Sequence, residues 1–171
     1  MKKILLTLIT AMLTFGAMAQ VNAVGIPFGM GKYEALQLLR SKYGEPAVNN
    51  IDMIMYTNFP LDGVTYETAS FRFNDDMKFT SAYFSRPNQP TAEALVADAK
   101  AVAEILEQQY LVVNLYANGA NQSYTQGNST IMTLYRAAPR KVVDGRPAYM
   151  INIIGFLSDE GSNIAVIYSL K

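Results

Sequence analysis

The chain contains no cysteine, no histidine and no tryptophan. Without cysteine it has no disulfides, thiol nucleophile, thiolate zinc site or iron–sulfur cluster. Without histidine it has no imidazole base, which excludes a Ser-His-Asp triad, a histidine-ligated metal and a histidine pH switch. Charge is also scarce, because 16% of the residues are charged and 14 Lys+Arg balance 14 Asp+Glu. A chain without a basic surplus is not expected to bind nucleic acid.

Hydrophobic residues, by contrast, make up 50% of the 171 residues. That fraction is ample for one packed core and far from the composition of a disordered chain. We therefore expect a single globular domain over residues 20–171.

The first 19 residues have the layout of a secretory signal peptide. Met1-Lys2-Lys3 is basic, residues 4–18 are uncharged and mostly apolar, and Ala17-Met18-Ala19 is a small-residue cleavage site. An uncleaved anchor or a buried helix is the alternative, but the run is shorter than the roughly 20 apolar residues that span a bilayer. With no cysteine to carry lipid, we expect a periplasmic or secreted protein, cleaved after Ala19 and without a membrane anchor.

Two amphipathic helices are expected. In residues 32–43, Leu36, Leu39 and Tyr43 share one face, and Gly44 followed by Pro46 marks the end. A second helix begins after Pro90 with Thr91 as N-cap. Its apolar face comprises Leu95, Ala99, Val102, Leu106 and Tyr110.

The rest of the chain favours short antiparallel strands. The expected strands are residues 51–59, 64–73, 79–85, 111–116, 130–136, 149–157 and 164–170. Turn residues separate them, and the polar residues 114–128 are expected to form a loop. The order predicts an α+β fold, an antiparallel sheet with two helices on one face. It also indicates two tandem α-β-β-β units, at residues 25–86 and 90–171.

Residues 26–46 carry a family resemblance. Gly29-Met30 precedes the polar helix start and Glu34, and Gly44-Glu45-Pro46 follows the helix. This pattern resembles exported bacterial domains of the β-lactamase-inhibitor-protein and outer-membrane-assembly-lipoprotein type. The resemblance implies a helix laid on an antiparallel sheet, a periplasmic or secreted location and a role in binding protein. No functional residue is carried over, because this chain lacks the cysteines of those proteins.

Nothing in the sequence predicts catalysis. The carboxylate pairs Asp75-Asp76 and Asp159-Glu160 would suit acid/base chemistry or a hard cation, but both lie among turn residues. A carboxylate hydrolase requires two acids that face one cleft. Neither Ser-x-x-Lys nor Gly-x-Ser-x-Gly occurs. We expect a protein without enzymatic activity, cofactor or metal.

Two groups of residues are candidates for partner binding. Arg136, Arg140, Lys141 and Arg146 form a basic cluster, which either docks an acidic partner or protects strand edges. Tyr66 and Tyr83 are expected on the helix-free face of the sheet. Tyrosine suits a binding surface, although aromatic residues also favour strands in general.

The sequence thus predicts an exported, non-catalytic interaction domain, a monomer or weak dimer that contacts another envelope or secreted protein. The alternative is a carrier of a small hydrophobic ligand, held in a cavity between the helices and the sheet. Methionine is flexible enough to make such a cavity adaptable. The candidates among the nine methionines are Met53, Met55, Met132 and Met150.

Overall fold

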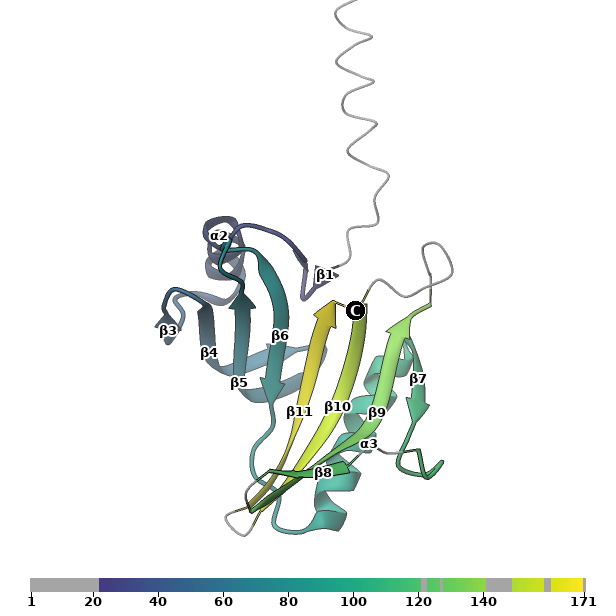
Figure 1. Ribbon diagram of the computed structural model, residues 1–171. Coiled ribbons are helices and arrows are strands. Elements are labelled where there is room, and N and C mark those ends of the chain that lie inside the picture. Colours follow the sequence, from purple (N-terminus) through teal and green to yellow (C-terminus); the bar gives the residue numbers. More distant parts are fainter. Residues whose placement is uncertain (1–21, 121–122, 127, 141–148, 159–160, 171) are drawn as a thin grey trace, which may run out of the picture.

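A computed structural model describes residues 22–120, 123–126, 128–140, 149–158 and 161–170. Two helices and one large antiparallel sheet make up the domain (Figure 1), which confirms the predicted α+β class. The predicted signal segment lies outside the described residues. Within them, no helix is both long and apolar enough to cross a membrane.

The first helix, α2 (Lys32–Tyr43), has the predicted bounds. It buries Ala35, Leu36 and Leu39, and it stops at Gly44, whose φ of 80° suits glycine. The N–H of Gly44 donates to the carbonyl of Arg40. The local sequence therefore sets both the length and the buried face of this helix.

The second helix, α3 (Ala92–Glu107), begins as predicted, because the Thr91 hydroxyl accepts a hydrogen bond of 3.1 Å from the N–H of Ala94. Its end was predicted wrongly. The helix ends at Glu107 and Tyr110 lies in the following strand, and the guanidinium of Arg140 donates to the carbonyl of Glu107 at 2.6 Å, at the last turn. Arg140 is 33 residues away from Glu107 in the sequence. The apolar pattern of the helix itself therefore gives no sign of this contact.

The strands form one small and one large sheet. The small sheet pairs β1 (Asn22–Ala23) with β2 (Ile26–Pro27). The large sheet contains β3 (Val48–Asn49), β4 (Met53–Leu61), β5 (Val64–Phe73), β6 (Phe79–Ser85), β7 (Tyr110–Asn114), β8 (Ser123–Gln126), β9 (Ser129–Pro139), β10 (Tyr149–Ser158) and β11 (Gly161–Leu170). Its order is β3-β4-β5-β6-β11-β10-β9-β7, with β8 also paired to β9.

Each helix is followed, after one or two short strands, by a three-stranded meander. Strands β4, β5 and β6 follow α2 and the short β3, whereas β9, β10 and β11 follow α3 and the shorter β7 and β8. The third strands of the two meanders, β6 and β11, pair antiparallel at the centre of the sheet. Strand β8 corrects the prediction that residues 114–128 form only a loop, because β9 is long enough to pair with β7 and β8 in succession.

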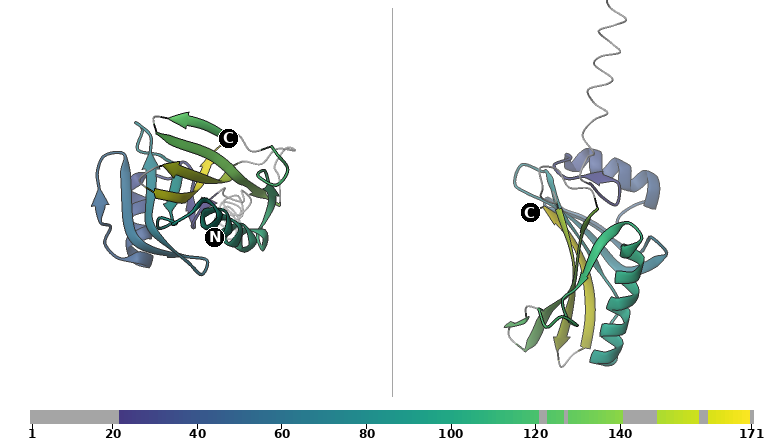
Figure 2. Two further views of the ribbon diagram at one scale, coloured as in Figure 1. Left: turned by 90° about the horizontal axis from the view of Figure 1, so that it is seen from below. Right: turned by 90° about the vertical axis from the view of Figure 1, so that its right-hand side faces the viewer.

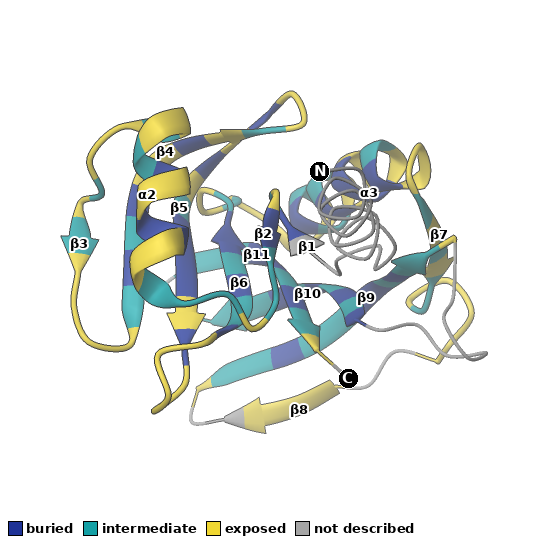
Figure 3. Cartoon of the chain, turned by 90° about the horizontal axis from the view of Figure 1, so that it is seen from above, coloured by how far each residue is buried: buried dark blue, intermediate teal, exposed yellow. Residues whose placement is uncertain are grey.

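Both helices pack on the same face of this sheet, here called the inner face (Figures 1 and 2). One cluster of buried side chains runs under both helices, and Figure 3 shows how the buried positions follow the middle strands. The cluster is rich in aromatic rings in contact with one another, among them Phe59, Phe71, Phe79, Phe84 and Tyr168. The opposite face, on which neither α2 nor α3 lies, is called the outer face below.

Strand β4 changes which side chains face inward. Tyr56 and Phe59 are three residues apart, yet both are buried and their rings lie 5.8 Å apart. Asn58 between them has a φ of 52°, a left-handed conformation that asparagine tolerates. Because of this distortion, the side chains before and after Asn58 that face the core are an odd number of residues apart. The paired strand β5 shows the same change of face, as described below for Tyr66.

An ion pair fastens α3 to the sheet. The guanidinium of Arg86, just after β6, contacts the Asp98 carboxylate at 2.8 Å and donates to the carbonyl of Thr65 at 2.6 Å. Both charged side chains are largely buried, and the hydrogen bond to Asp98 raises the pKa of Arg86. The pair holds the first half of α3 against strands β5 and β6.

Candidate functional site

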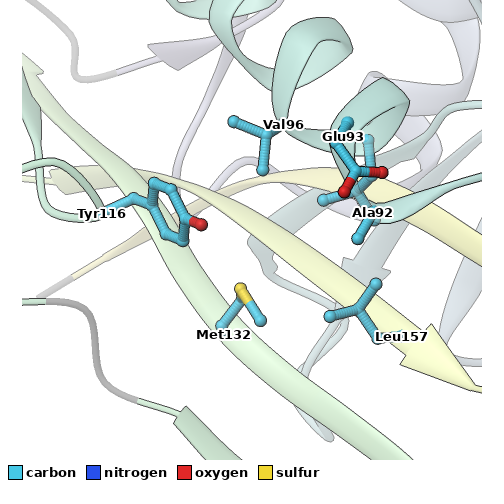
Figure 4. A pocket seen from close by; sticks show the side chains of 7 residues that line it. Ala92, Glu93, Val96, Tyr116, Met132 and Leu157 are labelled. Carbon is cyan, nitrogen blue, oxygen red and sulfur yellow. The ribbon is translucent and has the colours of Figure 1, made fainter.

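A hollow of about 320 Å³ lies on the inner face between the start of α3 and strands β9 and β10 (Figure 4). We call it the α3 pocket. It is lined by Ala92, Glu93, Leu95, Val96, Tyr116, Met132 and Leu157. Most of these side chains are apolar, and the volume falls at the lower end of the range of about 300–1,000 Å³ for small-molecule sites.

The first turn of α3 supplies one rim of the pocket. Thr91 caps the helix, and Glu93 follows in the first turn. Interactions with its own backbone and with Thr91 lower the pKa of the Glu93 carboxyl. Glu93 is exposed, so the pocket has a carboxylate at its mouth that is ionised at neutral pH.

Tyr116 supplies the opposite rim. It lies in a turn after β7, where the Asn114 side chain accepts the N–H of Ala117 at 2.8 Å. The N–H groups of Leu115 and Tyr116 both donate to the carbonyl of Leu134. Leu134 lies where the register of β9 and β10 shifts, so a bulge in the sheet positions this turn.

The floor comes from the inner face of the sheet. Met132 in β9 and Leu157 in β10 are half-buried, and Leu95 of α3 forms a fully buried wall. Gly155 is paired with Met132. A Cβ at Gly155 would lie 2.9 Å from Cδ2 of Leu95 and 3.2 Å from Cδ1 of Leu134, so glycine is needed for α3 to pack this close.

The chemistry of this lining suits binding. In Figure 4 the Tyr116 hydroxyl and the Glu93 carboxylate point toward the space above Met132 and Leu157. The site thus offers an apolar floor, one negative charge and one hydroxyl. No group of three or more Asp or Glu residues that could hold a metal ion occurs in the described part of the chain. Asp75 and Asp76 lie in the turn between β5 and β6, as predicted.

Tyr66 does not lie where the sequence predicts. It is 4% exposed, on the inner face, with its ring 5.3 Å from that of Phe84. Strict alternation in β5 from Phe71 puts Tyr66 on the outer face. The distortion at Asn58 reverses this, because Phe59 just after it pairs with Tyr66.

Tyr83 and Arg136, however, lie on the same face. Both are half-buried on the outer face, in one cross-strand row in which Ile167 and Asn152 separate them. Three strand spacings put their backbones about 14 Å apart. The Arg136 Nε donates to the Asn152 side chain at 3.2 Å.

The rest of the basic cluster does not form a surface with them in the described residues. Arg140 donates to the end of α3, as noted above, and is thereby held by its own domain. Lys141 and Arg146 lie outside the described residues.

Sequence reasoning identified part of the α3 pocket. Met132, named as a candidate for lining a cavity, does line it, whereas Met53, Met55 and Met150 are not among its lining residues. Glu93 was recognisable as a first-turn acid of the helix. Nothing local indicated that Tyr116 faces it, because the bulge at Leu134 brings them together.

No protein-family model, curated protein or solved structure matches this chain. The resemblance at residues 26–46 therefore stays a prediction.

Proposed function

We propose that this protein is an exported, non-catalytic binding domain that holds a small, mainly apolar molecule in the α3 pocket. The pocket itself carries the proposal, because five of its seven lining side chains are apolar and it opens between a helix and the sheet. Apolar hollows with a few converging polar groups are the usual form of small-molecule sites. The signal-like residues 1–19 support the exported location.

Filling the pocket tests this proposal. We expect 1-octanol to shift the ¹³C-methyl NMR signal of Met132 in a saturable way, because this methionine forms the floor. Val96→Phe adds a ring to a pocket wall and is expected to weaken binding at least tenfold. The same replacement at Val113, which is 50% exposed on β7 and outside the pocket, is the matched control. Equal octanol affinity in both variants would show that the pocket is not the site.

A second candidate function is contact with another envelope or secreted protein through the outer face. One specific observation favours it: Tyr83 and Arg136 lie in the same row, with the aliphatic Ile167 between them. Interfaces are enriched in tyrosine and arginine around apolar side chains. A partner with acidic residues around an apolar patch fits this row.

Photo-crosslinking tests the outer face. A photoreactive residue at Tyr83 is expected to crosslink one protein reproducibly in the native envelope, and Arg136→Glu is expected to reduce that yield at least fivefold by reversing the charge. Tyr33, 74% exposed on α2, is the control position. If Tyr33 yields the same crosslinked protein as Tyr83, or if Arg136→Glu leaves the yield unchanged, the outer face is not the contact surface.

A further inference from the structure

The charge of the α3 pocket narrows the class of ligand that it takes. Of its described lining residues, Glu93 carries a formal charge, and the others are neutral. Its carboxylate lies at the pocket (Figure 4). None of the salt bridges between described residues includes Glu93. An anionic ligand would bring a second negative charge close to this carboxylate, which is unfavourable.

The start of α3 offers little to an anion in spite of its helix dipole. Free N–H groups at a helix N-terminus normally attract anions. Here the Thr91 hydroxyl accepts the N–H of Ala94, and the Glu93 carboxylate lies in the same first turn. One of these N–H groups is therefore already capped, and the charged side chain at the pocket is a carboxylate.

Tyr116 completes the recognition of a positive group. In Figure 4 its hydroxyl points into the hollow that separates it from Glu93, and the side chain is 48% exposed, at the mouth. A tyrosine hydroxyl accepts hydrogen bonds from an ammonium group. The polar groups lie at the rim and the apolar ones, Leu95, Met132 and Leu157, lie below.

We propose that the ligand of the α3 pocket is a small amine, with a positively charged nitrogen between Glu93 and Tyr116 and an apolar body over Met132 and Leu157. This inference rests on the proposed ligand-binding function and assigns the chemical class of its ligand.

Three probes of equal chain length test the charge preference: octylammonium, octanoate and 1-octanol, each kept below the concentration at which it forms micelles. The Met132 methyl signal reports binding, and Met132→Leu assigns that signal. We expect octylammonium to bind at least tenfold more tightly than octanoate, with octanol in between. Glu93→Gln is expected to remove the preference between octylammonium and octanol, while octanol affinity stays within twofold.

Glu104→Gln is the matched control, since Glu104 is exposed on the same helix and outside the pocket. It should leave the affinities of all three probes unchanged. If octanoate binds as tightly as octylammonium, or if Glu93→Gln keeps the preference, the amine assignment is wrong although the pocket still binds. If none of the three probes shifts Met132, the ligand-binding function itself fails.

Discussion

Replacing Phe84 by alanine is expected to lower the free energy of unfolding by about 3–5 kcal/mol, the range for a large buried aromatic side chain. Phe84 is fully buried, and its ring contacts those of Phe59, Tyr66, Phe71 and Tyr168 at centroid distances of 5.3–5.9 Å. These contacts reach from β4 across to β11. The cavity left by alanine therefore weakens the junction between the two meanders.

Urea unfolding, followed by circular dichroism, measures this loss. Phe84→Leu keeps most of the buried volume and is expected to cost clearly less than alanine. Tyr33→Ala, at a side chain that is 74% exposed, should change stability by less than about 0.5 kcal/mol. If Phe84→Ala were as mild as Tyr33→Ala, the aromatic cluster would not form the core of the protein.

The protein is also expected to lose stability steeply above pH 10. Burial raises the pKa values of Tyr66, Tyr149 and Tyr168, and the hydrogen bond between the Tyr149 and Tyr110 hydroxyls adds to the shift for Tyr149. Below the ordinary tyrosine pKa of about 10, folded and unfolded chains hold these protons equally. Above it, the unfolded chain releases them first, so each tyrosine lowers stability by about 1.4 kcal/mol per pH unit until its folded pKa is reached.

Urea unfolding at pH 8, 10 and 11 tests this slope, which for three such tyrosines amounts to about 4 kcal/mol per pH unit. Tyr168→Phe removes one buried hydroxyl and should make the slope above pH 10 shallower by about 1.4 kcal/mol per pH unit. Tyr124→Phe, at a side chain that is 60% exposed on β8, should leave the slope as it is. A flat profile between pH 10 and 11 would contradict the burial of these hydroxyls.

The elements that local chemistry controls were predictable from the sequence. Helix α2 has the expected bounds because Gly44 ends it, and α3 begins where Thr91 caps it. The bounds of β5 and β6 also match the predicted ones. In these helices and strands, apolar and polar side chains follow the period of the element over a few residues. The local sequence is therefore enough to predict the type of element and its bounds.

Features set by distant contacts were not predictable. The face of Tyr66 depends on the backbone of Asn58 in a neighbouring strand, and the last turn of α3 is contacted by Arg140, which lies far along the chain. Strand β8 forms because β9 extends beyond the pairing with β7. The α3 pocket combines side chains from a helix, a turn and two strands. Met132 was predicted to line a cavity only because methionine is a flexible apolar residue.

The central position of β11 affects the order in which the sheet can assemble. This strand follows all the other described strands in the chain, yet it lies between β6 and β10 and pairs Ala165 with Ser85. Until β11 has been synthesised, the edges of β6 and β10 have no partner, and the core under Phe84 lacks Tyr168. Pairings between residues so far apart in sequence form slowly. For a chain exported as we propose, the sheet would stay open until this strand had been synthesised.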